Sequence, residues 1–130
     1  MSSNRPLSPH LSVYKFKYTL LSSILNRIAG GGLTAGLLVL VYWLMALANG
    51  PESYAKAVMV LSHPVFKLIF AGFAFAFAYH FVAGIRHLIW DTGRGLEKHQ
   101  SQKSAWLVGA LSVLLTLGLI AWACLRMGAP

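Results

Sequence analysis

The residues from Ile28 to Ala48, "IAGGGLTAGLLVLVYWLMALA", contain no charged side chain and decide the fold of this chain. About 20 predominantly apolar residues in a helix cross the roughly 30 Å hydrocarbon core of a bilayer. Two further apolar segments follow, at about residues 65–90 and 105–125. We therefore predict an all-α membrane protein with three transmembrane helices, at about residues 28–48, 65–90 and 105–125, and no strands.

The composition supports this prediction. Of the 130 residues, 57% are hydrophobic and only 11% are charged, which is too apolar for a small soluble domain. The net charge of +8 comes from basic residues that flank the apolar segments instead of gathering on a polar domain. We therefore expect contact with membrane lipids and no nucleic-acid partner.

The lysines and arginines predict the orientation, because cytoplasmic loops carry an excess of positive charge. Eight lie on one side of the predicted spans and three on the other. This places the N-terminus in the cytoplasm and the C-terminus in the periplasm of a bacterial inner (cytoplasmic) membrane, as a multi-pass protein without a cleaved signal. The eight are Arg5, Lys15, Lys17, Arg27, Arg86, Arg94, Lys98 and Lys103, and the three are Lys56, Lys67 and Arg126.

The chain then divides into three parts. Residues 1–27 form a cytoplasmic segment and the start of the first helix, residues 28–125 the three-helix domain, and residues 126–130 a periplasmic tail. Residues 49–64 are predicted as a connection that opens with a Gly-Pro turn and closes with a proline before the second span. Residues 91–104 are polar and are predicted as a loop.

The second span carries a histidine, His80, well inside an apolar helix. Such a residue has three possible roles: it can be a ligand of haem iron, relay protons, or form a hydrogen bond to a neighbouring helix. No other histidine of the chain lies as deep, so a haem with two histidine ligands would take the second from another chain. Helical spacing puts small residues beside His80, against which a flat group could lie: Gly72, Ala76, Ala83 or Gly84, with His87 further along the same face.

His87 and Arg86 lie about 10 Å further along the helix, at the cytoplasmic membrane surface. If His80 binds haem iron, these two side chains would contact the haem propionates. Arg86 has an alternative role, in which its side chain reaches out of the membrane and helps to set the topology.

Ser23 and Arg27 lie at the cytoplasmic end of the first span, four residues apart and therefore on one helix face. A hydroxyl and a guanidinium are hydrogen-bond donors suited to a quinone carbonyl. The alternatives are a helix cap for the serine and a topology signal for the arginine. Glycines 30–32 and Gly36 predict close helix contacts, within the bundle or with partner helices.

Three motifs give the chain a family resemblance: "RPLSPHLSVYK" (Arg5–Lys15), "SILNRIAG" (Ser23–Gly30) and "HFVAGIRHLIWD" (His80–Asp91). In these motifs, and in length and span number, the chain resembles the cytochrome b556 subunits of succinate dehydrogenase. The resemblance implies a membrane anchor for a flavoprotein subunit and an iron-sulfur subunit, packed beside a second three-helix anchor. It implies haem b shared between the anchors, ubiquinone as substrate, and FAD and iron-sulfur clusters in the partner subunits only.

The resemblance also assigns residues. It makes His80 the iron ligand, places His87 and Arg86 at the propionates, and gives Ser23 and Arg27 to the quinone site. It implies no catalytic residue, since the chain catalyses nothing alone. A haem-free structural anchor, a fumarate reductase anchor and a small transporter or proton-conducting subunit are the alternatives.

The chain departs from the resembled pattern at one position. Many members of the family have histidine before the arginine of the second motif, where this chain has Asn26. Asparagine can hydrogen-bond a propionate or a water, but it does not titrate near neutral pH. A role for this position in proton delivery is therefore not expected here.

Overall fold

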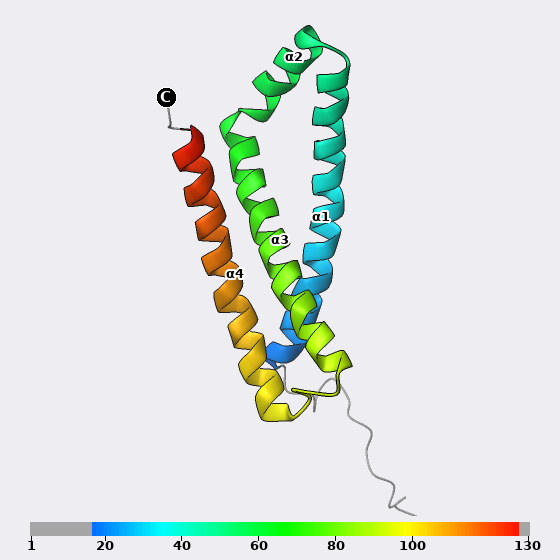
Figure 1. The fold of residues 1–130 in the computed structure, drawn as a ribbon, viewed down its shortest axis with the longest axis vertical. Helices are drawn as coiled ribbons and strands as arrows, with labels where there is room; N and C mark the ends of the chain where they lie inside the picture. The colour runs from blue at the N-terminus through cyan, green and yellow to red at the C-terminus, as the bar shows by residue number, and fades with distance from the viewer. Residues whose placement is uncertain (1–16, 128–130) are drawn as a thin grey trace, which may run out of the picture.

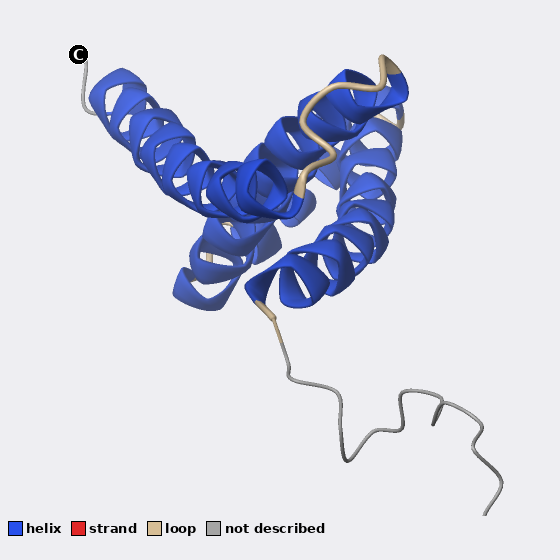
Figure 2. Cartoon of the chain, turned by 90° about the horizontal axis from the view of Figure 1, so that it is seen from below, coloured by secondary structure: helices blue, strands red, loops and turns tan. Residues whose placement is uncertain are grey.

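The computed structural model describes residues 17–127, and this part of the chain is helical without strands. It contains α1 (Tyr18–Ala48), α2 (Pro51–Leu61), α3 (Pro64–Asp91) and α4 (Lys98–Met127), joined by short loops (Figures 1 and 2). The helices α1, α3 and α4 are each long and apolar enough to cross a membrane, which confirms the three predicted spans. The first motif of the resemblance, and the last three residues, lie outside the described part.

The prediction for the connection between the first two spans is wrong in one respect, because most of this connection forms the helix α2. Pro51 occupies the first turn of α2, after Gly50 with φ of +100°, so the predicted Gly-Pro turn is the start of this helix. Pro64 begins α3 in the same way, and His63 caps that helix by accepting a hydrogen bond from the Val65 N–H at 3.3 Å. Most of this segment is therefore a helix, which the sequence analysis did not predict.

The two longest helices extend past the predicted spans. α1 begins at Tyr18, about ten residues before the predicted span, and α4 begins at Lys98 instead of about residue 105. The N-cap of α1 is Lys17, so Ser22 and Ser23 lie within the helix and neither is its cap. This removes the capping alternative for Ser23.

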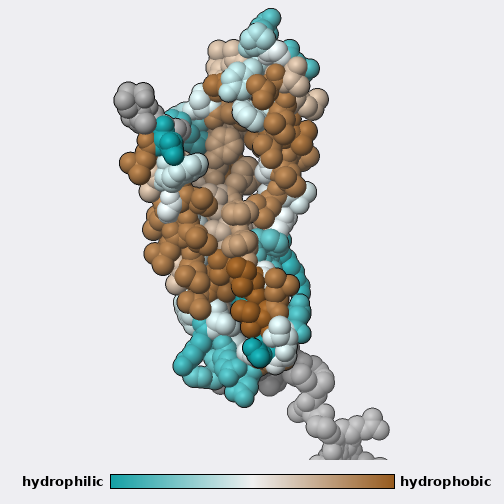
Figure 3. Space-filling model, in the orientation of Figure 1, coloured by the Kyte–Doolittle hydropathy of each residue, from teal (hydrophilic) through white to brown (hydrophobic). Residues whose placement is uncertain are grey.

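Hydrophobic side chains cover the outside of the bundle. Leu38, Leu68 and Leu114 are 69%, 75% and 64% exposed, while many of the buried positions are alanines. Figure 3 shows hydrophobic residues over the middle of the molecule and hydrophilic residues at its two ends. Such a surface is matched to lipid tails or to partner helices, since water would not solvate it.

The three long helices pack most closely at one end. In Figure 1, α1 and α3 lie together in the lower half and diverge above, where α2 bridges them, and α4 runs along the other side of α3. The core here is formed by Ala29 of α1, Tyr79 and Ala83 of α3, and Val108 of α4. Higher up, Gly32 and Gly36 of α1 face Ala76 and Phe73, which confirms the predicted close contact within the bundle.

A buried arginine joins the three helices at this end. Arg86 of α3 is only 5% exposed. Its guanidinium donates hydrogen bonds to the Ser104 hydroxyl at 2.9 Å and the Ser101 carbonyl at 2.9 Å, both on α4, and to the Ser22 hydroxyl of α1 at 3.4 Å. The guanidinium also lies over the Trp90 ring, 3.9 Å from its centroid. We call Arg86, Ser22, Ser101 and Ser104, together with Tyr79, the arginine cluster.

Tyr79 completes the arginine cluster on the α1 side. Its hydroxyl donates to the Ser22 hydroxyl at 3.0 Å, so Ser22 is tied to two residues of α3. Nearby, Tyr18 of α1 stacks on Trp106 of α4 with ring centroids 4.2 Å apart. The Tyr18 hydroxyl would lie 2.9 Å from a Cβ at Gly109, so a larger residue at this position would require the tyrosine side chain to shift. These contacts fix where the first turns of α1 lie.

We predict that Arg86→Lys destabilises the bundle. A lysine keeps the charge but cannot reproduce the planar fork that reaches two helices, and hydrogen bonds to charged groups contribute about 1.5–3 kcal/mol each. The midpoint of thermal unfolding, followed by circular dichroism in detergent, should fall accordingly. Arg94→Lys, at an exposed position in the loop after α3, is the matched control and should unfold like the wild type. Equal midpoints for the two variants would contradict the role given to Arg86.

Candidate functional site

His80 lies on α3 at the edge of the contact with α1, and it is exposed in this chain. Its Nδ1 lies 3.2 Å from the backbone carbonyl oxygen of Asn26. Because a carbonyl oxygen can only accept, this hydrogen bond requires the proton on Nδ1, and in the neutral imidazole Nε2 then has a free lone pair. The predicted hydrogen bond to a neighbouring helix is therefore present, but it uses only one of the two ring nitrogens.

The predicted stripe of small residues around His80 is split by the packing. Ala83 is buried in the core at 1% exposure, and Ala76 packs against that core. Gly72 and Gly84, in contrast, border open space, where an added Cβ would meet no atom within 4 Å. The bare surface next to His80 is therefore on the Gly84 side.

His87 and Arg86 are neighbours in sequence but point to different surroundings. His87 is partly exposed and makes an edge-on contact with the Trp90 ring, with centroids 5.2 Å apart. Arg86 is turned into the bundle, where the arginine cluster uses its guanidinium. The alternative in which Arg86 reaches out of the membrane does not describe this buried side chain.

Ser23 and Arg27 share the outer side of α1. Arg27 is exposed and Ser23 is partly exposed. The preceding serine, Ser22, is 1% exposed and belongs to the arginine cluster. The two adjacent serines thus have separate surroundings, and Ser23 is the one whose hydroxyl remains available beside Arg27.

Asn26 carries an unsatisfied polar atom. Its side-chain Oδ1 is buried and has no hydrogen-bond partner within the described residues. Buried polar atoms in proteins are nearly always paired, so an unpaired one indicates a missing water, ligand or partner chain. The atom belongs to the same residue whose backbone carbonyl holds His80.

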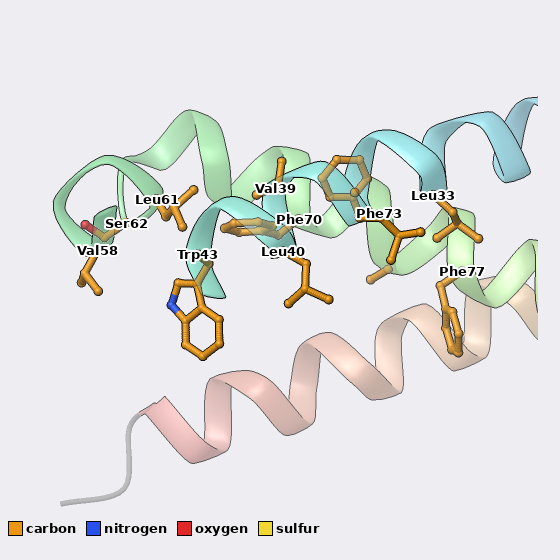
Figure 4. A pocket seen from close by; sticks show the side chains of 13 residues that line it. Leu33, Val39, Leu40, Trp43, Val58, Leu61, Ser62, Phe70, Phe73 and Phe77 are labelled. Atoms are coloured by element: carbon orange, nitrogen blue, oxygen red, sulfur yellow. The ribbon is translucent and has the colours of Figure 1, made fainter. Parts of the chain in front are cut away.

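A large apolar pocket lies elsewhere in the bundle. It has a volume of about 800 Å³ and opens between α1, α2 and α3, lined almost entirely by apolar side chains such as Trp43, Phe70 and Phe77 (Figure 4). None of the predicted site residues lines it. Its lining has no charged side chain, and its side-chain hydrogen-bonding groups are the Ser62 hydroxyl and the Trp43 indole N–H.

The arginine cluster is the part of this end that sequence reasoning missed. A signal was present, because Tyr79, Ala83 and Arg86 follow the i, i+4, i+7 spacing of one helix face. Ser101 and Ser104 were assigned to a loop, so they were not recognised as helical hydrogen-bond partners. No group of three or more metal-ligating side chains occurs among residues 17–127, so a metal here would depend on few protein ligands.

Comparison with known proteins identifies the family. Residues 1–119 match the family model described as "Succinate dehydrogenase/Fumarate reductase transmembrane subunit". The succinate dehydrogenase cytochrome b556 subunit of Paracoccus denitrificans is 41% identical over 114 residues, which cover 88% of each chain. The corresponding subunit of Rickettsia typhi is 35% identical over 88% of this chain and 90% of its own.

A mitochondrial relative shows similar agreement. The human succinate dehydrogenase cytochrome b560 subunit is 38% identical over 123 residues, which cover 93% of this chain and 73% of the human one. The predicted resemblance is confirmed by matches that span most of the sequence. This chain belongs to the family of transmembrane subunits of succinate dehydrogenase and fumarate reductase.

Proposed function

We propose that this chain is the haem-binding membrane anchor of a succinate dehydrogenase in a bacterial inner membrane, with its N-terminus in the cytoplasm. It would hold haem b together with a second anchor subunit and form part of a ubiquinone-reducing site. Electrons from succinate would reach ubiquinone through the FAD and iron-sulfur clusters of partner subunits. The names of its relatives, which are succinate dehydrogenase cytochrome b subunits, support this proposal.

One observation carries the haem assignment. His80 lies deep in a membrane-spanning helix and is exposed, with a ring nitrogen that the fold of the chain does not use. An imidazole nitrogen is a common axial ligand of haem iron, which supplies one-electron redox chemistry when bound. The bare surface at Gly84 and the unpaired Asn26 Oδ1 also fit a group that the isolated chain lacks. The donor set therefore fits haem b.

The other predicted residues take supporting roles. His87 lies about two turns beyond His80 towards the end of α3, where a propionate could accept a hydrogen bond from its ring. We also propose that Arg86 contacts a haem propionate. To do so, its guanidinium would have to break some of its hydrogen bonds within the arginine cluster. A second axial ligand would come from the partner anchor.

Ser23 and Arg27 are the proposed quinone residues of this chain. Both lie on the outer side of α1, where a partner subunit could complete the site, and the arginine cluster holds the adjacent Ser22 in place. A guanidinium and a hydroxyl can orient the quinone carbonyl and stabilise negative charge that develops on its oxygen. Their fixed position on a rigid helix is what this chain contributes to the reaction.

We expect His80→Ala to remove the haem. The reduced-minus-oxidised spectrum of the purified complex should show a b-type signal for the wild type and a lost or strongly altered one for the variant. His99→Ala, at an exposed position in the first turn of α4, is the matched control and should keep the wild-type spectrum. An unchanged spectrum for His80→Ala in an intact complex would refute the assignment of His80 as ligand.

We also expect Ser23→Ala and Arg27→Ala to slow quinone reduction by at least about tenfold, because each removes a hydrogen-bond donor aimed at the reacting oxygen. Oxidation of succinate by a soluble dye that accepts electrons before the quinone site should continue at the wild-type rate. Lys103→Ala, which removes an exposed positive charge near the same end, is the control. Wild-type quinone reduction in both site variants would place the quinone elsewhere.

A further inference from the structure

We infer that the backbone of α1 positions the proposed haem ligand: the carbonyl of Asn26 holds Nδ1–H of His80, and Gly30 provides the space for the imidazole. This inference rests on the proposed function of His80. Asn26 acts through its backbone carbonyl, and Gly30 acts through the absence of a side chain.

The hydrogen bond selects the nitrogen that binds iron. Nδ1 of His80 lies 3.2 Å from the Asn26 carbonyl oxygen. Within the helix, this carbonyl already faces the N–H of Gly30 four residues later, and a carbonyl oxygen has a second lone pair for another donor. A proton held on Nδ1 fixes the tautomer in which Nε2 is the free metal-binding nitrogen.

Gly30 is the residue that permits this approach. A Cβ at position 30 would lie 3.2 Å from Cε1 of His80, which is closer than an ordinary van der Waals contact, and 3.4 Å from Nδ1, at the short limit of such contacts. An alanine there would therefore displace the ring by a few tenths of an ångström, at the carbon next to the nitrogen that forms the hydrogen bond. The close packing of α1 and α3 at this point thus depends on a missing side chain.

The two neighbouring glycines differ in this respect, and they serve as matched controls. A Cβ at Gly31 would meet no atom within 4 Å, and a Cβ at Gly32 would meet only the Ala76 Cβ at 3.9 Å. Glycine-to-alanine substitution changes helix propensity equally at all three positions. Only at position 30 would the added Cβ also contact the proposed ligand, His80.

The hydrogen bond also affects the iron chemistry. A carbonyl that accepts from Nδ1–H makes the imidazole a stronger electron donor, which favours the ferric state. Weakening this bond should therefore raise the reduction potential of the haem. It should also change the low-spin electron paramagnetic resonance signal, which depends on the orientation of the axial ligands.

The experiment compares Gly30→Ala, Gly31→Ala and Gly32→Ala in the purified complex, measuring haem content, reduction potential and the paramagnetic resonance spectrum. We expect a positive shift in potential and an altered spectrum for Gly30→Ala alone, with haem retained. Wild-type values for Gly30→Ala, or equal shifts in all three variants, would overturn the inference.

The outcomes separate the two proposals. A wild-type complex without a b-type spectrum, or an unchanged spectrum in His80→Ala, refutes the proposed function and this inference with it. If His80→Ala loses the haem signal but Gly30→Ala has the wild-type potential and paramagnetic resonance spectrum, only the inference is refuted. If Gly30→Ala prevents isolation of the complex, the redox-difference infrared spectrum of the wild type decides, since the inference requires an axial histidine with a protonated, hydrogen-bonded Nδ1.

Discussion

A buried guanidinium with no carboxylate partner sets the geometry of the end of the bundle that carries the candidate site. Within residues 17–127, the sole ion pair is the exposed one between Glu52 and Lys56, so Arg86 is satisfied by hydroxyl and carbonyl oxygens and by an aromatic face. Burial of a charge is costly unless hydrogen bonds replace its hydration, and those bonds reach both neighbouring helices. The requirement to satisfy one side chain therefore places α1 and α4 relative to α3.

The rest of the bundle depends on small residues, because apolar surfaces give helices little reason to associate within lipid. Alanines and glycines let the backbones approach, while the leucines and phenylalanines remain outside, where lipid or partner helices can cover them. Above the closely packed end, α1 and α3 diverge and leave the apolar pocket beneath α2. The molecule therefore has a tightly packed polar end and a looser apolar end.

The helix α1 connects the two parts of the proposed function. Its inner side meets α3 through Ser22, the Asn26 carbonyl and Gly30, and its outer side carries Ser23 and Arg27. A proposed haem ligand and proposed quinone residues would then be held by one rigid element, with little freedom to move relative to each other. This rigidity suits electron transfer, which requires fixed distances more than moving groups. The enzyme's partner subunits would complete both sites.

The sequence by itself determined the helical class, the three spans and the depth of His80, because these follow from hydrophobic length and helical spacing along one segment. It also identified Ser23, Arg27 and His87 as polar residues near one end, and the family through its motifs. It did not predict that Ser22 joins α1 to α3 or that Arg86 is buried, and it missed α2. Contacts between helices decided those points: local spacing cannot tell which face of α1 meets α3, or that Ser101 and Ser104 would lie opposite a guanidinium. The bond between His80 and the Asn26 carbonyl is of the same kind, since it joins residues 54 positions apart and uses a backbone atom that every residue possesses.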